Sequence, residues 1–272
     1  RNNAGMIYDA TQQRTGLFGG AGANVYGDTW LWNGSSWLSA QPLVSPSSRV
    51  GPGLSYDPVR SKWVLFGGRN ASGQLLNDTW EYDSAANTWK SFSPPTLPNV
   101  RWFGSMAFHK GVGKTIMLGG IGDFNNPNDM WEWNGSLWVQ LEDDNANDPA
   151  IRFGGAALVY DEMRTTLVSF GGIDGAGYDN RTFEYTYGQP KWNELHPAHR
   201  PAVSPAIGAY DLGRQRTLIY QGSGSDLWEW DGIDWIHRGP GVSPPTRGFG
   251  QVTYDGERKR VVLFGGSFGS PL

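Results

Sequence analysis

The sequence predicts an all-β propeller of six four-stranded blades, with the sixth blade lacking its outer two strands. Three observations predict this fold. The chain repeats about every fifty residues, most units carry a pair of adjacent glycines, and five units contain an aromatic-rich segment followed by a lone Trp. A repeat of this length is typical of propeller blades, each of which buries its faces only against its neighbours. We therefore expect residues 1–272 to form a single domain.

Each unit begins with a short segment of small and apolar residues, which we expect to form the innermost strand. The segment ends in an aromatic residue followed in most units by Asp: Tyr8-Asp9, Tyr56-Asp57, Phe108-His109, Tyr160-Asp161, Tyr210-Asp211 and Tyr254-Asp255. The spacings between these aromatic residues are 48, 52, 52, 50 and 44 residues. The units are therefore about 1–48, 49–100, 101–151, 152–203, 204–246 and 247–272, of which the last is partial.

The second strand is a continuous apolar run that ends in glycine. Trp63-Val64-Leu65-Phe66, for example, is expected to be buried on both faces. Glycines that follow such a run suit positions of positive φ or of close approach to a neighbouring backbone. They are Gly19-Gly20, Gly67-Gly68, Gly119-Gly120, Gly171-Gly172, Gly265-Gly266 and the degenerate Gln221-Gly222.

The two outer strands are predicted from alternation and turn residues. Thr79-Trp80-Glu81-Tyr82 alternates as a half-exposed strand does, and Asn33-Gly34, Asn134-Gly135 and Asp231-Gly232 are strong hairpin turns. The lone Trp that follows would give at most about 4–6 kcal/mol when buried between blades. We predict that these Trp residues are structural wedges: Trp37, Trp89, Trp138, Trp192 and Trp235.

The sixth unit stops at Leu272 without its two outer strands. We expect that its blade is open, or that strands from a segment outside this chain or from a partner complete it.

The order and spacing of the glycine pair, the later aromatic residue and the final Trp resemble the kelch-repeat family over essentially the whole chain. In the second unit the repeat reads Leu65–Gly68 followed by Asn77–Tyr82. This form of the repeat looks like that of the kelch-type propellers of bacterial exported proteins, which belong to the galactose-oxidase-like superfamily. The resemblance implies a propeller whose innermost strand comes first in each unit. We accordingly expect a secreted protein, either extracellular or periplasmic.

Composition excludes several classes of function. The net charge is −4, from 22 basic and 26 acidic residues, which argues against a general nucleic-acid partner. The chain contains no cysteine, so it has no disulfide, thiol nucleophile or thiolate metal site. No apolar run approaches the length of a membrane span, so we expect no membrane partner.

The long loops lie on one face, where a rigid scaffold usually carries its binding site. An arginine recurs just before the innermost strand: Arg1, Arg49, Arg101, Arg152 and Arg247. We predict that these residues line the mouth of the central channel and bind carboxylates or phosphates, as the kelch resemblance also implies. The alternative is that each pairs with backbone carbonyls or with an Asp of its own or the next blade. Non-repeated residues on this face are further candidates: Tyr26, Trp102, Phe103, Asp123, Asp174 and Tyr178.

Catalytic patterns are few. His196 and His199 flank Pro197 in a loop, which lacks the helical geometry that places paired histidines on one metal ion. We expect neither a metal nor a cofactor, and the copper chemistry of kelch-like oxidases is excluded because it needs a cysteine. We therefore favour a non-catalytic module that binds a protein segment or an anionic small molecule or glycan. The alternative is a propeller enzyme (hydrolase, lyase or sugar epimerase) at the same channel mouth, with His196 or His199 as the candidate base.

Overall fold

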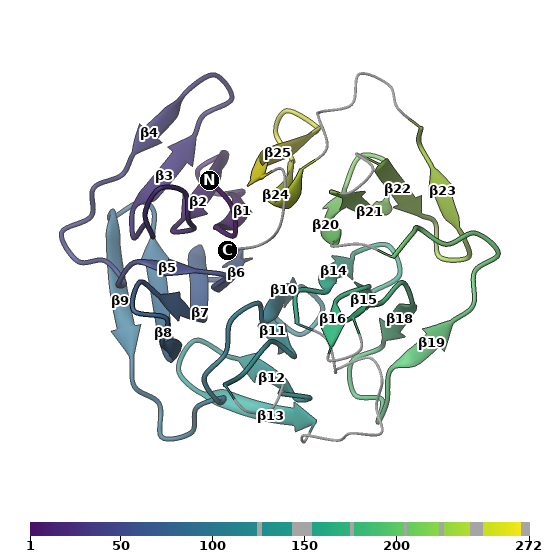
Figure 1. Cartoon of the computed structure of the whole chain (residues 1–272), viewed down its shortest axis with the longest axis horizontal. Helices are drawn as coiled ribbons and strands as arrows, with labels where there is room; N and C mark the ends of the chain where they lie inside the picture. The colour runs from purple at the N-terminus through teal and green to yellow at the C-terminus, as the bar shows by residue number, and fades with distance from the viewer. Residues whose placement is uncertain are drawn as a thin grey trace.

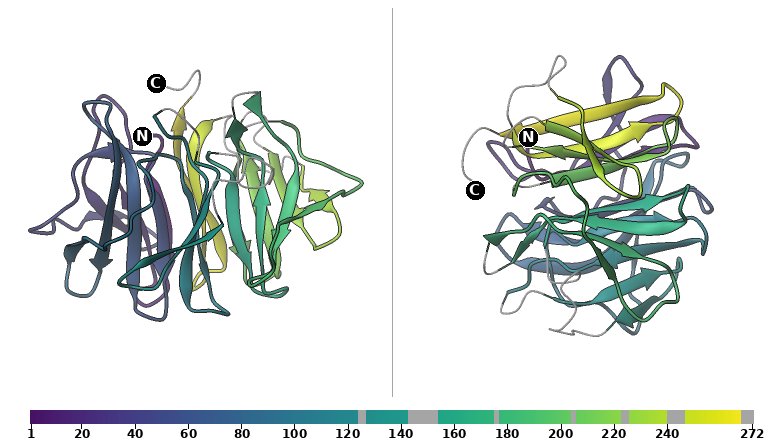
Figure 2. Two further views of the ribbon diagram at one scale, coloured as in Figure 1. Left: turned by 90° about the horizontal axis from the view of Figure 1, so that it is seen from below. Right: turned by 90° about the vertical axis from the view of Figure 1, so that its right-hand side faces the viewer.

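The computed structural model describes residues 1–123, 127–142, 154–174, 177–203, 206–222, 226–239 and 247–267. These residues form antiparallel sheets arranged around a central axis (Figure 1). Seen from the side, the strands of neighbouring blades stand next to one another along that axis (Figure 2). The predicted all-β propeller is therefore confirmed. No helix within the described ranges is long and apolar enough to cross a membrane.

The structure has five blades, and within each blade the strands follow chain order from the centre outward. Blade 1 contains β1 (Gly5–Asp9), β2 (Arg14–Phe18), β3 (Thr29–Trp32) and β4 (Trp37–Ser39). Blade 2 contains β5 (Arg49–Val50), β6 (Gly53–Asp57), β7 (Lys62–Asn70), β8 (Leu75–Asp83) and β9 (Thr88–Phe92). Blade 3 contains β10 (Ser105–His109), β11 (Lys114–Leu118), β12 (Met130–Trp133) and β13 (Trp138–Glu142).

Blades 4 and 5 follow the same order. Blade 4 contains β14 (Ala157–Asp161), β15 (Thr166–Phe170), β18 (Thr182–Tyr185) and β19 (Asn193–Leu195), with the small ribbon β16 (Ile173–Asp174) and β17 (Gly177–Tyr178) in its long loop. Blade 5 contains β20 (Ala206–Asp211), β21 (Arg216–Gln221), β22 (Asp226–Trp230) and β23 (Trp235–His237).

The predicted count of six blades is wrong. The sixth unit forms only a two-stranded hairpin of β24 (Gly248–Asp255) and β25 (Arg260–Ser267). Within the described residues β25 pairs only with β24, so this unit has two strands and does not make a four-stranded blade. The hairpin lies between β1 of blade 1 and β20 of blade 5 (Figure 1).

A series of backbone hydrogen bonds joins the inner ends of the units. The N–H groups of Gly51, Phe103 and Gly155 donate to the carbonyl oxygens of Asn3, Gly51 and Phe103, at 2.8, 2.7 and 2.8 Å. The N–H of Asn3 donates to the carbonyl of Phe249 at 3.0 Å, which links the hairpin to blade 1. All five residues have a φ between 50° and 65°. In this left-handed conformation the N–H groups of Asn3, Gly51, Phe103 and Gly155 point toward the preceding unit around the ring.

The glycine pairs allow adjacent blades to approach closely, as predicted. Gly67 has a φ of 61°, and a Cβ atom there would lie 2.5 Å from the carbonyl oxygen of Arg101 in blade 3. The N–H of Gly68 donates to the same oxygen at 2.8 Å. Gly265-Gly266 makes equivalent contacts with the carbonyl of Arg1, so the hairpin meets blade 1 as one blade meets the next.

Trp89, Trp138 and Trp235 each pack against the preceding blade, which confirms the predicted wedges at these three positions. Trp192 is buried in a core cluster shared with blade 3, and Trp37 contacts the hairpin. Trp89 is 2% exposed. Its ring lies 5.0 Å from that of Phe18 in blade 1, and its Nε1–H donates to Thr29 Oγ1 at 3.0 Å. Trp138 and Trp235 make the same pair of contacts with the blades before them.

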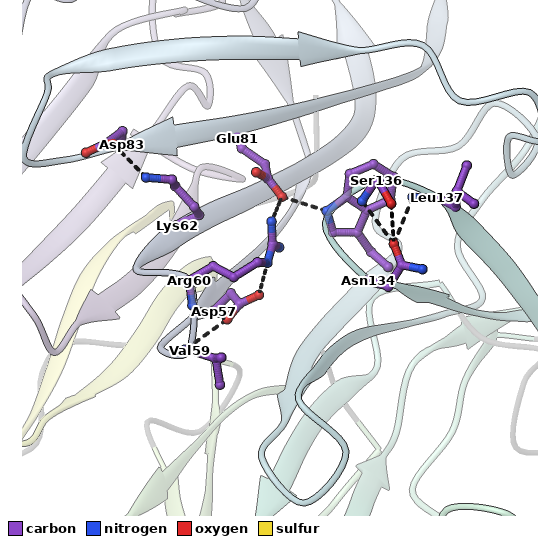
Figure 3. Close-up of polar contacts among 10 residues, drawn as sticks. Asp57, Val59, Arg60, Lys62, Glu81, Asp83, Asn134, Ser136 and Leu137 are labelled. Carbon is purple, nitrogen blue, oxygen red and sulfur yellow. Dashed lines mark hydrogen bonds and ion pairs between the residues drawn. The ribbon is translucent and has the colours of Figure 1, made fainter.

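The basic residues of the short turns also join blades, a role that the sequence did not indicate. Asp57 Oδ1 accepts the backbone N–H groups of Val59 and Arg60. The Arg60 guanidinium donates to Asp57 at 2.7 Å and to Glu81 at 2.5 Å (Figure 3). Glu81 also accepts the Nε1–H of Trp133 in blade 3 at 2.7 Å. A continuous polar chain therefore connects blades 2 and 3.

Candidate binding site at the channel mouth

A cavity of about 490 Å³ lies at the centre of the propeller. Its wall consists of the first residues of the innermost strands and the residues that follow the glycine pairs, so it opens toward the long loops. The lining is mostly apolar and includes Met6, Leu54, Met106 and Ile207. Its only charged members among the described residues are Arg69 and Arg247. The cavity is therefore an apolar pocket with a positive rim.

Trp102 and Phe103 form an aromatic platform at this opening. Their rings are stacked, with centroids 4.4 Å apart and planes at 29°. The guanidinium carbon of Arg69 lies 4.1 Å from the centroid of the Trp102 ring, a distance typical of a cation–π contact. Two backbone hydrogen bonds between Trp102 and Ile121 fix the platform to the end of β11. We call Arg69, Trp102, Phe103 and Tyr178 the mouth cluster; all four line the cavity.

Phe103 has a backbone conformation that phenylalanine rarely adopts. Its φ is 54°, and Phe249 in the hairpin has a φ of 60°. The left-handed region costs an ordinary residue about 1–2 kcal/mol. The equivalent positions in blades 1, 2 and 4 hold Asn3, Gly51 and Gly155, and asparagine and glycine tolerate the left-handed conformation. An aromatic side chain at this position is thus a feature that the fold alone does not require.

Two of the recurrent arginines, Arg49 and Arg101, are buried inside their own blades. The side chain of Arg101 is 1% exposed. It donates to both carboxylate oxygens of Asp129, at 2.5 and 2.8 Å, and to the carbonyl of Gly119 at 2.9 Å. Asp129 also accepts the Nε1–H of Trp131. These contacts favour the structural alternative for Arg101, whereas its predicted role in ligand binding stays a prediction.

Arg49 makes the same contacts in blade 2. Its side chain is fully buried and donates to both oxygens of Asp78, at 2.6 and 2.8 Å, and to the carbonyl of Gly67. Burial alone would raise the pKa of Asp78, but the hydrogen bonds and the charge of Arg49 outweigh it and lower that pKa below its usual range. The ion pair therefore keeps Asp78 charged.

Of the other three arginines, Arg1 makes the same kinds of contact in a more exposed position. Arg1 pairs with Asp28 at 2.8 Å and covers the ring of Tyr26 at 4.0 Å. Arg247 lines the cavity and donates to the carbonyl of Gly265 at 3.1 Å. Arg152 lies outside the described residues. Of the four described members of the predicted ring, only Arg247 is therefore among the residues that line the cavity.

The remaining predicted ligand-binding residues are divided between the cavity and the surface. Tyr178 lines the cavity and is 37% exposed, and burial raises the pKa of its phenol. Tyr26 and Asp123 are not part of the lining, and Asp123 is exposed. The backbone of Asp174 pairs with Gly177 in the β16–β17 ribbon. The structure describes the backbone of Asp174 but not its side chain.

The two histidine candidates for catalysis are surface residues. The side chains of His196 and His199 are each 72% exposed, and neither lines the cavity. His199 Nδ1 lies 2.6 Å from Asp234 Oδ2. No cluster of three or more His, Asp or Glu residues with metal-binding geometry occurs in the described part of the chain. The structure therefore does not bring these histidines to the channel.

Comparison with known sequences agrees with this architecture. The sequence model of the KLHDC2/KLHL20/DRC7 Kelch-repeats domain matches residues 5–206. The chain belongs to the kelch-repeat family. A kelch β-propeller of this kind indicates a protein-binding module. The narrower resemblance to bacterial exported propellers stays a prediction.

Two curated relatives match the kelch chain at low identity. It is 27% identical to Adagio-like protein 3 of Oryza sativa subsp. japonica, over 96% of this chain and 45% of that protein. It is 26% identical to tRNA wybutosine-synthesizing protein 4 of Aspergillus fumigatus, over 52% of this chain and 15% of that protein. The chain thus spans less than half the length of the curated relatives it matches.

Arg69 is the mouth residue that the sequence analysis missed. A comparison of the residue after each glycine pair would have found it, because the kelch repeats place Ala21, Ile121, Ile173 and Ser267 there and only Arg69 is charged. The recurrence of Arg49 and Arg101 instead reflects their contacts with Asp78 and Asp129 inside their own blades. Residues that differ between repeats were the better indicator of the site.

His109 is a buried histidine at the position where the other units have Asp. It is 3% exposed, neither ring nitrogen has a hydrogen-bond partner, and its ring lies 4.5 Å from that of Tyr160. Burial lowers the pKa of His109. At pH values between that pKa and the unfolded value near 6.5, the unfolded chain binds a proton that the folded chain does not.

The stability contributed by neutral His109 is therefore complete above about pH 6.5 and decreases as the pH falls from there to the folded pKa. Urea unfolding between pH 5 and 7 should reveal this decrease as a slope in the free energy of unfolding. His109→Gln should flatten the slope. A variant with the same slope as the native protein would show that His109 is not its source.

Proposed function

We propose that this kelch domain binds an extended protein segment at the channel mouth. In this proposal an apolar side chain of the segment enters the central cavity and packs on Trp102 and Phe103. A carboxylate of the same segment interacts with Arg69 and Arg247. The cavity volume of about 490 Å³ lies within the usual range for binding pockets.

The observation that carries this proposal is the position of Arg69. Its guanidinium stacks on Trp102 at the rim of a cavity that no Asp or Glu lines within the described residues. A cation held on an aromatic ring in this way is oriented in advance, which reduces the entropy lost on binding an anion. The unusual backbone of Phe103 is a second support, because strained residues cluster at functional sites.

The enzyme alternative receives less support from the same surface. The described lining includes hydroxyl groups, amides and two arginines but no imidazole or carboxylate. General acid–base catalysis needs a titratable group within hydrogen-bond reach of the substrate. Besides the arginines, the described lining offers only the phenols of Tyr178 and Tyr220, and burial raises the pKa of Tyr178, which makes it a poor base near neutral pH. An anionic glycan or small molecule would use Arg69 in the same manner as a peptide carboxylate, but it would use the apolar part of the cavity less well.

A phage-displayed library of random heptapeptides would test the proposal. We expect the native domain to enrich peptides that combine an acidic group with a large apolar residue. Trp102→Ala and Arg69→Gln should each weaken binding of a selected peptide about tenfold, equivalent to about 1.4 kcal/mol. Added salt should reduce binding to the native domain more than binding to the Arg69→Gln variant.

Arg216→Gln is the matched control, since Arg216 is a partly exposed arginine of β21 outside the cavity lining. It should bind the selected peptide as the native domain does. The proposal fails if the Trp102 and Arg69 variants retain native affinity, or if the library yields no peptide that binds the native domain.

A further inference from the structure

A second, smaller pocket lies beside the central cavity, between blades 1 and 2. Its volume is about 150 Å³, and we call it the side pocket. Blade 1 contributes Ala21 and Val25 to its wall, and blade 2 contributes Val50 and Ala71. These four side chains give the side pocket an apolar wall.

The side pocket adjoins the central cavity at the mouth cluster. Arg69, Trp102 and Phe103 line both spaces, as does Asn3 of blade 1. The guanidinium of Arg69 lies on the ring of Trp102 at 4.1 Å, so this one cation–π pair borders the central cavity and the side pocket. A segment bound in the central cavity would therefore reach the side pocket by crossing this pair.

The side pocket exists because the β7–β8 hairpin is longer than the fold requires. β7 and β8 have nine residues each, whereas the second and third strands of blades 1, 3, 4 and 5 have four to six. The extension pairs Arg69 with Leu75, and the turn that follows brings Ala71 and Gly73 into the wall of the side pocket. Like the aromatic side chain of Phe103, this extension goes beyond the needs of the propeller.

Both walls of the side pocket are held in place by hydrogen bonds. In the turn, Asn70 Oδ1 accepts the backbone N–H groups of Ser72 and Gln74, each at 3.0 Å, and Asn70 Nδ2 donates to Gln74 Oε1 at 3.1 Å. On the opposite wall, Asn2 and Ala21 exchange two backbone hydrogen bonds, at 2.8 and 2.9 Å. Walls that are ordered in advance lower the entropy lost when a side chain enters.

Asn2 also gives the side pocket a polar group without a partner. The residue lines the pocket, and its Oδ1 atom is buried with no hydrogen-bond donor among the described residues. Buried acceptors of this kind are rare in folded proteins. Because no hydrogen bond holds this oxygen, the amide can turn toward a donor in the pocket without losing one.

The size of the side pocket favours a branched aliphatic side chain. A void of about 150 Å³ holds a molecule about as large as benzene, so a valine, isoleucine or leucine side chain fits and an indole does not. In an extended segment, side chains two positions apart lie on the same side, about 6.5–7 Å from each other. This spacing allows two such side chains to lie on opposite sides of the Arg69–Trp102 pair.

We propose that the side pocket is a second subsite for the segment that binds at the channel mouth. It selects a valine, isoleucine or leucine two positions from the apolar residue that fills the central cavity, which we call the anchor. The segment crosses the Arg69–Trp102 pair between these two residues, and one of its backbone N–H groups donates to Asn2. The second subsite depends on the proposed function, because the anchor must first occupy the central cavity.

The heptapeptides selected by the native domain test the second subsite directly. We expect valine, isoleucine or leucine to be enriched two positions from the anchor. In a selected peptide, replacing this residue with alanine should weaken binding on the order of tenfold, because several buried methyl or methylene groups are lost. Isothermal titration calorimetry of the selected peptide and its alanine form would measure the difference.

Variants of the domain assign this preference to the side pocket. Val25→Phe fills the pocket and should abolish the difference between the two peptides, while the alanine form binds as it does to the native domain. Asn2→Ala removes the acceptor and should weaken both peptides about fivefold, the effect of losing one hydrogen bond. Val44→Phe is the matched control, since Val44 is exposed and lines neither space. It should keep the native preference.

The second subsite is ruled out if Val25→Phe keeps the native preference, or if Asn2→Ala binds both peptides as the native domain does. Selected peptides that need only the anchor and an acidic group would also rule it out, and they would leave the proposed function intact. A library that yields no binding peptide would contradict both proposals.

Discussion

Replacing Arg101 with alanine is expected to lower the free energy of unfolding by about 3–5 kcal/mol, the usual effect of removing one partner of a buried ion pair. The change leaves the carboxylate of Asp129 in a site where that residue is 4% exposed. It also removes the hydrogen bond to the carbonyl of Gly119. Urea unfolding followed by Trp fluorescence would measure the loss.

Arg1→Ala is the matched control, because Arg1 makes the same two kinds of contact in blade 1. Its side chain and that of Asp28 are 15% and 36% exposed, so solvent screens the pair and we expect a loss of about 1 kcal/mol or less. If Arg101→Ala instead unfolds within about 1 kcal/mol of the native protein and no longer binds the selected heptapeptides, the recurrent arginines belong to the binding site.

Trp89→Ala is expected to lower the free energy of unfolding by about 3–5 kcal/mol, as is usual when a buried aromatic side chain is truncated in a core. Trp89 packs between Phe18 of blade 1 and Tyr82 of its own blade, with ring centroids 5.0 Å away in both directions. The truncation would leave a cavity between two blades, and it would remove the hydrogen bond to Thr29. Urea unfolding again provides the measurement.

Trp37→Ala is the control that distinguishes the loss of a tryptophan buried between two blades from the loss of a partly exposed tryptophan. Trp37 contacts Phe264 of the hairpin but remains partly exposed, so its truncation removes less buried surface. We expect less than half of the loss found for Trp89→Ala. Equal losses at the two positions would contradict the view that the wedges depend on a complete preceding blade.

The repeat was readable in the sequence because each of its elements serves the fold. Gly67 and Gly68 are required where the carbonyl of Arg101 approaches, and Trp138 is required between blades 2 and 3. Such residues recur because the same contact recurs. The number of blades was wrong because the sixth unit carries the signature of the first two strands only, and a signature of two strands does not make a blade.

The candidate binding site is harder to predict for the same reason. The recurrence of Arg49 and Arg101 predicts ligand-binding groups, yet their side chains are 0% and 1% exposed. Trp102 and Tyr178 do not repeat, and both line the cavity. The partner of a guanidinium group depends on three-dimensional neighbours, in this case Asp78 and Asp129, which follow their arginines by 29 and 28 residues. Sequence spacing alone did not decide between these carboxylates and a ligand.

The central claim is that a protein segment binds at the mouth cluster while the interblade tryptophans only hold the fold. The indole N–H signals of the 14 tryptophans, recorded in a two-dimensional ¹H–¹⁵N spectrum during titration with a selected heptapeptide, test it most directly. Trp102 is the one tryptophan among the described residues that lines the cavity. We predict that its signal, assigned with the Trp102→Ala variant, shifts most while those of Trp89, Trp138 and Trp235 stay in place. A Trp102 signal that does not move while the peptide saturates the domain would contradict the claim.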